Sequence, residues 1–231
     1  MQLYDSTAHL YDKRHENATT RHLRKREMEA MKKHAKGFVL DIGCGTGAYI
    51  GVSDDYVGID ISKNMLEEAS KKSKKPFAVA SAEILPFRNS SFNTVICMFT
   101  VLNLCDYEKA AKEMHRVLRP GGIAIVSVAS VWDRKNYRFL DKLKNRYGSD
   151  VKNVRIEKEK LRFKMFAKDE LVSLFEKKGF ELKRMHGIYK FQEPYWNRYV
   201  NFGIVARAKL LVERLFPPQL GRIYIAVFRK A

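Results

Sequence analysis

The stretch Val39–Gly47, which reads VLDIGCGTG, decides the fold of this chain. Its first part is apolar apart from one acid, which is typical of a buried strand. It runs directly into three glycines at alternate positions, which permit positive φ and let a ligand approach the backbone. A turn of this kind presents unpaired N–H groups to a bound cofactor. The sequence therefore predicts a strand that ends in a cofactor-binding turn.

The acid of this strand, Asp41, distinguishes between classes of cofactor. A carboxylate would repel the phosphates of a dinucleotide and attract an ammonium or sulfonium group. We therefore expect S-adenosylmethionine rather than NAD, with Asp41 orienting its ammonium group and the backbone of Gly43, Gly45 and Gly47 surrounding its methionine part. Cys44 lies in the same cofactor-binding turn, where we expect its side chain to be a small packing group rather than a nucleophile.

Four later stretches continue a strand–helix pattern at consistent spacing. They are Tyr56–Ser62, Ala82–Phe87, Phe92–Phe99 and Arg116–Gly122, the last leading into a strand at Ile123–Val128. Together with the glycine turn they resemble the class I S-adenosylmethionine-dependent methyltransferases. The resemblance implies an α/β fold with a seven-stranded, mostly parallel sheet, an antiparallel last strand and helices on both faces. It also leaves a helical or irregular insertion after strand five.

The resemblance implies further cofactor contacts at the ends of the next strands. An acid after the second strand is placed to bind ribose hydroxyls, as in other doubly wound folds. These contacts are Asp60 and Ile61 at the ribose, Ser81, Ala82 and Glu83 at the adenine, and Met98 and Phe99 beneath the reactive methyl group.

Two residues are candidates for contact with the acceptor, and no general base is identified. The run Phe99–Asp106 looks like that of quinone-biosynthesis C-methyltransferases, which have an asparagine at the place of Asn103. Asn103 either orients the substrate or caps a loop. Tyr11, with Tyr4, either contacts the methionine end or substrate, or packs an N-terminal helix onto the sheet. We expect the nearby basic turn Arg21–Arg26 to be a solvated face.

The chain between Gly47 and Val57 is too short for a full helix, so the first crossover is expected to be about one turn. Here Gly45–Ser53 resembles the tRNA wobble-uridine carboxymethyl methyltransferases. The chain departs from that subgroup at Asn103-Leu104, where the subgroup has paired histidines, and it lacks the N-terminal arginine-tyrosine motif. The resemblance implies an RNA substrate without specifying the modification.

The charge distribution also favours RNA as a partner. The formal net charge of +18 divides into +4 for residues 1–36, 0 for residues 37–130 and +14 for residues 131–231. A one-sided excess of this size favours a polyanion. We therefore expect methyl transfer to RNA, in the first place tRNA. The alternatives are a small apolar acceptor such as a quinone or lipid precursor and, as another class, a non-catalytic scaffold.

The chain is expected to form one domain, residues 1–231, in four parts. These are an N-terminal helical cap (1–36), a cofactor half (37–130), an insertion (131–166) and a C-terminal part of the sheet (167–231). The insertion mixes cations with aromatics and is either a lid or an RNA-binding surface. An apolar and basic helix at residues 196–216 could lie on a membrane surface, face an accessory protein or pack on the sheet.

Other sequence features bear on membrane insertion, cellular location and metal binding. No apolar run approaches the length of about 20 residues that a membrane span needs, and Met1–Asp5 lacks a signal-peptide layout. An odd number of cysteines suits a reducing cytoplasm, where we place the protein. The six histidines show no metal-ligand spacing, so no metal is expected.

Overall fold

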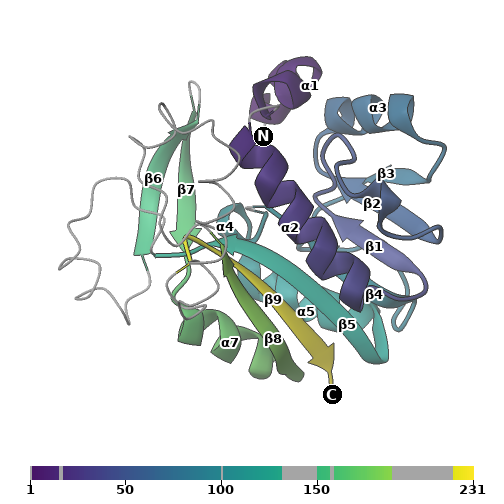
Figure 1. Cartoon of the computed structure of the whole chain (residues 1–231), viewed down its shortest axis with the longest axis vertical. Helices are drawn as coiled ribbons and strands as arrows, with labels where there is room; N and C mark the ends of the chain where they lie inside the picture. Colours follow the sequence, from purple (N-terminus) through teal and green to yellow (C-terminus); the bar gives the residue numbers. More distant parts are fainter. Residues whose placement is uncertain (1, 16–17, 100, 132–149, 157–158, 189–220) are drawn as a thin grey trace, which may run out of the picture.

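The computed structural model describes residues 2–15, 18–99, 101–131, 150–156, 159–188 and 221–231 (Figure 1). Its core is a seven-stranded sheet in the order β3-β2-β1-β4-β5-β9-β8, accompanied by the two-stranded sheet β6–β7. The strands are β1 (Val39–Ile42), β2 (Tyr56–Asp60), β3 (Phe77–Val79), β4 (Phe92–Cys97), β5 (Leu118–Ala129), β6 (Asp150–Ile156), β7 (Glu159–Met165), β8 (Phe180–Ile188) and β9 (Ile223–Lys230). The helices are α1 (Gln2–His15), α2 (Ala18–His34), α3 (Lys63–Lys72), α4 (Val101–Leu104), α5 (Tyr107–Val117) and α7 (Lys168–Glu176), with a 3₁₀ turn η1 (Ile50–Val52).

The direction of the strands confirms the fold expected from the sequence. Strands β1 to β5 pair in parallel. Strand β9 lies between β5 and β8 and is antiparallel to both. The inner strand β1 is buried at all four of its residues, as expected of a parallel strand covered on both faces.

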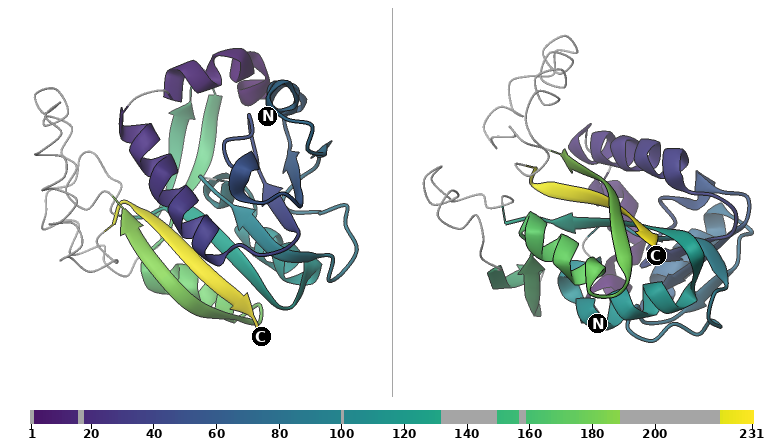
Figure 2. Two further views of the ribbon diagram at one scale, coloured as in Figure 1. Left: turned by 45° about the vertical axis from the view of Figure 1, so that its right-hand side comes forward. Right: turned by 90° about the horizontal axis from the view of Figure 1, so that it is seen from below.

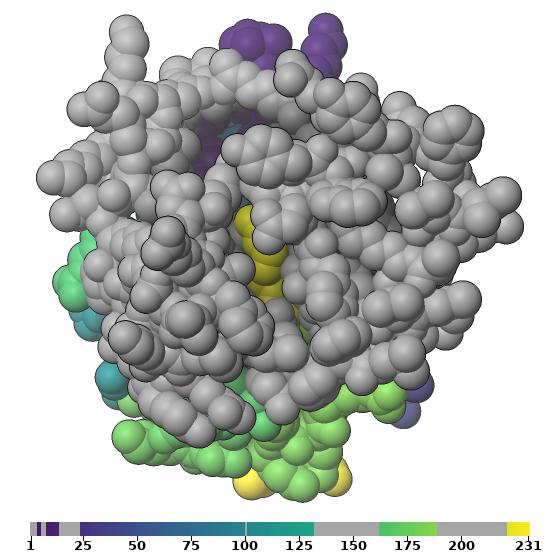
Figure 3. Space-filling view, turned by 60° about the vertical axis from the view of Figure 1, so that its left-hand side comes forward, coloured from purple at the N-terminus to yellow at the C-terminus, as the bar shows by residue number. Residues whose placement is uncertain are grey.

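Two apolar layers sandwich the sheet. On one face α4, α5 and α7 bury side chains such as Leu102, Met114 and Phe175. On the other face α2 crosses the sheet and buries Met31 against residues of β4, β5 and β9 (Figures 1 and 2). Figure 3 shows α7, β8 and the end of β9 together at one end of the molecule. Helix α2 thus lies over the sheet on the face opposite α5.

Local signals in the sequence account for the short connections. The crossover from β1 to β2 contains the three residues of η1 in place of a full helix, as expected. Ser62 caps α3 by accepting a hydrogen bond from Met65 N at 3.2 Å. Asp106 caps α5 in the same way, accepting from Lys109 N at 3.2 Å. Both caps follow the preference of serine and aspartate for this position.

The expected helical or irregular insertion was wrong where the structure describes it. Residues 150–156 and 159–165 form the antiparallel pair β6–β7. The signal for a strand was present, because Leu161, Phe163 and Met165 alternate with Arg162 and Lys164, and alternation of this kind is typical of a strand. The rest of the insertion up to residue 149, and the helix expected at 196–216, lie outside the described residues.

Candidate functional site

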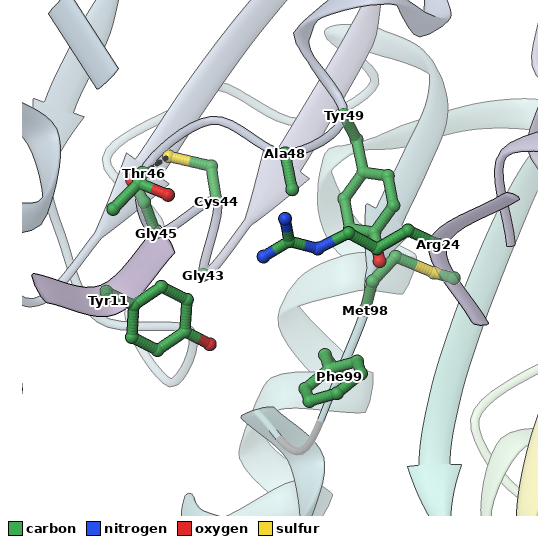
Figure 4. A pocket seen from close by; sticks show the side chains of 10 residues that line it. All are labelled: Tyr11, Arg24, Gly43, Cys44, Gly45, Thr46, Ala48, Tyr49, Met98 and Phe99. Carbon is green, nitrogen blue, oxygen red and sulfur yellow. Dashed lines mark hydrogen bonds between the residues drawn. The ribbon is translucent and has the colours of Figure 1, made fainter. Parts of the chain in front are cut away.

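A pocket opens where the ends of β1 and β4 meet the cap formed by α1 and α2 (Figure 4). It encloses about 440 Å³ of empty space, including its open mouth. Its lining residues are Tyr11, Arg24, Gly43, Cys44, Gly45, Thr46, Ala48, Tyr49, Met98 and Phe99. Of the residues expected to bind the cofactor, the pocket therefore gathers Gly43, Cys44, Gly45, Met98 and Phe99, and it adds the candidate Tyr11.

The glycine turn leaves room for a ligand at Gly45. This residue has a φ of +53°, which side chains rarely adopt, and a β-carbon placed on it would meet no atom within 4 Å. The positive φ accounts for the glycine, and the open space beside it leaves room for a ligand to lie against its backbone. Cys44 is buried beside this turn, and burial raises the pKa of its thiol, as expected of a packing group.

Asp41 lies buried beneath the turn with half of its carboxylate satisfied. Its Oδ2 accepts a hydrogen bond from Tyr56 Oη at 2.8 Å. Its Oδ1 is buried and has no partner in the part of the chain that the structure describes. Burial raises the pKa of this carboxyl to about 7. An unpaired buried carboxylate oxygen fits a positively charged ligand group, so the site suits the ammonium group of S-adenosylmethionine.

Asp60 connects the glycine turn to the end of β2. Its Oδ2 accepts from Gly45 N and its Oδ1 from Ser62 N, both at 2.9 Å. These two bonds fix the carboxylate beside the turn, and each oxygen keeps a further lone pair for a ligand hydroxyl. Burial raises the pKa of Asp60 above its ordinary value, while the backbone donors oppose that effect. The geometry suits the expected contact with ribose.

Asp41 and Asp60 are not among the residues that line the pocket, and neither are the remaining expected cofactor residues. Gly47 packs against Ile50, and Ile61 is exposed beyond Asp60. Ser81 Oγ accepts from Glu83 N at 3.1 Å, and Glu83 Oε1 accepts from Asp106 N at 2.9 Å. Glu83 thus contacts the start of α5. The buried Ala82 follows Ser81, and the role of this group at the adenine stays a prediction.

Helix α1 is fastened over the cofactor turn by two acids. Asp5 accepts from Ser62 Oγ, and its backbone carbonyl accepts from Asn64 Nδ2 at 2.9 Å. Asp12 accepts from Thr46 Oγ1 at 2.7 Å and pairs with Lys72. These contacts place the ring of Tyr11 at the pocket, where burial raises the pKa of its phenol to about 12.

Arg24 is the functional residue that the sequence analysis missed. We expected a solvated basic turn, yet Arg24 extends its guanidinium group into the pocket (Figure 4). The helical period contained the signal, because Arg24 lies four and seven residues before Met28 and Met31, two apolar positions of the same helix face. Thr46, Ala48 and Tyr49 were missed too, although they follow the glycine turn directly.

Asn103 lies away from the pocket lining and is bound to backbone on all sides. Its Nδ2 donates to Ala129 O at 3.1 Å and to Lys164 O at 2.5 Å, and its Oδ1 accepts from Ala129 N at 3.0 Å. Asn103 thus joins α4 to the end of β5 and to β7. Its contacts favour the structural alternative, and a role in orienting substrate stays a prediction.

No group of three or more histidine, cysteine, aspartate or glutamate side chains suited to a metal occurs among the described residues. Within the same residues, no helix has the length and apolar character needed to cross a membrane.

Comparison with known proteins agrees with this site. Residues 40–126 match the family model described as a methyltransferase domain. The chain is 37% identical over 193 residues to uncharacterized protein MJ1252 of Methanocaldococcus jannaschii, covering 78% of this chain and 76% of that one. It is 31% identical over 176 residues to demethylmenaquinone methyltransferase of Staphylococcus haemolyticus, covering 68% of this chain and 74% of that one.

Solved structures share the fold at low sequence identity. A SAM-dependent methyltransferase from Thermotoga maritima, described as a possible histamine N-methyltransferase, superposes with a TM-score of 0.69 at 22% identity over 100% of this chain and 99% of that one. A putative methyltransferase of Haloferax volcanii, solved in complex with the Trm112 methyltransferase activator, gives 0.67 at 18% identity over 98% and 97% of the two chains. With the glycine turn, Asp41 and Asp60 in place, these findings identify the chain as a member of the class I S-adenosylmethionine-dependent methyltransferases.

Proposed function

We propose that this enzyme transfers the methyl group of S-adenosylmethionine to a small aromatic acceptor of the quinol type. The proposal rests on the protonation states of the titratable side chains that line the pocket. In the described part of the chain its titratable lining residues are Tyr11, Arg24, Cys44 and Tyr49. Burial raises the pKa of the two phenols and the thiol. None of these four residues acts as a general base at neutral pH. The acceptor must therefore be nucleophilic without being deprotonated by them.

A quinol satisfies that requirement because an electron-rich ring carbon can attack the methyl carbon directly. The S–CH3 bond breaks, S-adenosylhomocysteine leaves, and the ring proton that is lost passes to water. Bound S-adenosylmethionine supplies a methyl group made electrophilic by its sulfonium. The rings of Tyr11 and Phe99 lie at the pocket and suit a flat aromatic acceptor (Figure 4). Tyr11 keeps its proton at neutral pH and can donate a hydrogen bond to the acceptor oxygen. The demethylmenaquinone methyltransferases among the relatives support the same class of acceptor.

Different residues then bind different groups of the cofactor. Arg24 faces the pocket beside the glycine turn and can pair with the methionine carboxylate. We assign Asp41 to the ammonium group and Asp60 to the ribose. Holding the nucleophile and the methyl carbon in line at about 3 Å can supply much of the rate acceleration. Positioning is therefore the main contribution of the protein to the reaction.

The test is transfer of labelled methyl from S-adenosylmethionine to demethylmenaquinol and, in parallel, to total RNA. We expect label in the quinol and none above background in RNA. Asp60→Ala is the control, because loss of the ribose contact should weaken cofactor affinity about tenfold or more and abolish the signal at low cofactor concentration. Label confined to the RNA fraction would overturn the proposal.

RNA is the second candidate, and a cluster of cations favours it. Arg26, Lys33 and His34 of α2 lie near Arg184 and His186 of β8. Burial and these positive neighbours lower the pKa of His186 to about 4 and lower that of His34 as well. Glu29 pairs with Arg26 at 3.4 Å on an exposed part of the helix. The histidines thus report a local excess of positive charge that a phosphate backbone would balance.

A salt titration with tRNA separates this candidate from the first. If RNA is the acceptor, affinity should fall steeply between low and physiological salt, because phosphate contacts release counterions. Lys33→Glu combined with Arg184→Glu should weaken tRNA binding and leave cofactor binding unchanged. A flat salt response, with the double variant binding tRNA like the wild type, would count against RNA.

We also propose that an accessory protein binds and activates this enzyme. The Haloferax volcanii protein that shares the fold was solved with an activator. In this chain Val79 and Ile84 are exposed apolar residues on and after the edge strand β3. Replacing both by serine should leave cofactor binding intact and reduce activation by any partner that binds this edge.

A further inference from the structure

Glu27 is a fully buried carboxylic acid on α2, with no exposed surface. Its Oε2 accepts a hydrogen bond from Tyr49 Oη, and its Oε1 accepts one from Ser127 Oγ at 2.8 Å. Both partners donate, which is the arrangement that an ionised carboxylate requires. One side chain therefore joins α2, the segment after the glycine turn and strand β5.

The position of Glu27 relates these contacts to the pocket. Tyr49, which donates to Glu27, is a pocket wall, and Arg24 lies one turn earlier on the same helix and lines the pocket as well. The next turn of α2 places Met31 in the apolar layer on this face of the sheet. Glu27 contacts Tyr49 and Ser127, and Met31 is buried one turn later on the same helix. These contacts fix α2 beside the pocket and thereby the position of Arg24.

An apolar residue at this position would cost less free energy than a carboxylate. Burying a charge is unfavourable unless it is paired and hydrogen-bonded, and apolar replacements of buried ionic groups are often neutral or stabilising. Neighbouring apolar side chains such as Met31, Ile96 and Ile125 form a continuous layer. Stability alone therefore does not account for a glutamate here.

We propose that Glu27 is a positioning residue for cofactor binding, and that its ionised form holds α2 and Tyr49 so that Arg24 faces the cofactor. It does not itself line the pocket and acts through Arg24 and Tyr49. The proposal rests on cofactor binding and is independent of which acceptor the enzyme uses.

Glu27 changes its protonation in the physiological range. Burial raises its pKa to about 7, while the hydrogen bonds from Tyr49 and Ser127 and the charge of Arg24 lower it. The charge of Asp41 on β1 acts on the same Tyr49 and raises its pKa. Because the ionised form accepts both hydroxyl groups, we expect cofactor affinity to rise as pH rises through 7. By linkage, binding then releases a proton.

The experiment is calorimetric titration of the full chain with S-adenosylmethionine at pH 6, 7 and 8. For the wild type we expect affinity to increase about tenfold over this range, the order of one linked proton. Glu27→Gln should bind at pH 8 about tenfold more weakly than the wild type and should keep only the part of the pH dependence that Asp41 supplies. Glu29→Gln removes an exposed carboxylate from the same helix and should behave like the wild type.

Two outcomes would overturn the proposal. The first is a Glu27→Gln protein that keeps the affinity and pH dependence of the wild type, because a purely structural glutamate, or a pH effect that belongs to Asp41, gives that result. The second comes from Tyr49→Phe, which removes one hydroxyl and leaves the carboxyl in place. If Glu27→Gln does not fold, this variant tests the same contact, and wild-type affinity at pH 8 would refute it.

Discussion

The glycine turn and the helical cap hold the same pocket from opposite sides by different means. The turn is held by backbone: Gly43 N and Cys44 N both donate to Ile59 O, at 2.8 and 2.9 Å. The cap is held by side chains, through Asp5 and Asp12 of α1 and Glu27 of α2. A backbone contact needs only the right local conformation, whereas each side-chain contact depends on a particular residue. The turn therefore depends on its backbone conformation, and the cap can be altered one contact at a time.

The largest effect should come from the turn. Gly43→Ala places a β-carbon 2.3 Å from Val101 Cγ2 at a φ of +70°. We expect it to cost about 1–3 kcal/mol of stability from strain and overpacking, measured by urea unfolding. Gly45→Ala is the matched variant, because its β-carbon meets open space. It shares the strain of a positive φ (+53°) and should lose only that part of the stability, about 1 kcal/mol, and it should lose cofactor affinity in addition. Equal stability losses in both would contradict this account of the turn.

Arg24 provides the next test, on the cap side. Arg24→Met keeps much of the apolar stem and removes the charge, so we expect affinity for S-adenosylmethionine to fall about tenfold, as for loss of a charge-assisted hydrogen bond. Methylthioadenosine lacks the methionine carboxylate and should bind both proteins equally well. A parallel loss for both ligands would show that Arg24 acts on the pocket's shape rather than on the carboxylate.

The buried acids make the stability of the cofactor-free protein depend on pH. Burial raises the pKa of Asp41 to about 7, above its ordinary value of 3.8. An acid whose pKa is raised by folding stabilises the folded state while protonated, so stability should decline as pH rises from about 4 through 7. Asp41→Asn should flatten this decline in thermal melts taken between pH 5 and 8. A wild-type melting temperature that does not fall over that range would argue against the raised pKa.

The smallest effect should come from loosening α1. Asp12 is half-buried, and its hydrogen bonds to Lys72 and Thr46 outweigh burial and lower its pKa. An acid with a lowered pKa stabilises the folded state above its ordinary pKa and loses this effect as the pH falls through the lowered pKa. The contacts of Asp12 with Thr46 and Lys72 are therefore intact at neutral pH. Asp12→Asn should speed cofactor release a few-fold and leave the melting temperature within about 2 °C, because exposed pairs contribute about 1 kcal/mol or less. Stopped-flow release with Lys13→Gln as control measures this effect.

The difference between turn and cap also explains what the sequence could predict. Strands, the short crossover, the caps Ser62 and Asp106 and the glycine turn follow from patterns within a few residues. Glu27 acts through contacts with Tyr49 and Ser127, far away along the chain, and no local pattern marks such a contact. The helix face of Arg24 follows from its spacing to Met28 and Met31, but the pocket that it enters does not. The prediction for β6–β7 was wrong for another reason. The alternation of apolar and basic residues that is typical of a strand is present there, but the aromatic and basic composition of the segment favoured an irregular insertion.

The placement of β9 has a consequence for how the chain folds during synthesis. Strands β1 to β5 and the glycine turn precede residue 130, so the cofactor-binding half can assemble on the growing chain. Among the described strands, β8 pairs with β9 alone, and β9 pairs with β5 on its other side. Until residues up to Lys230 have been made, β5 keeps an open edge and β8 has no place in the sheet. An open strand edge is a site of aggregation, so the interval before β9 inserts is when the nascent protein most needs protection.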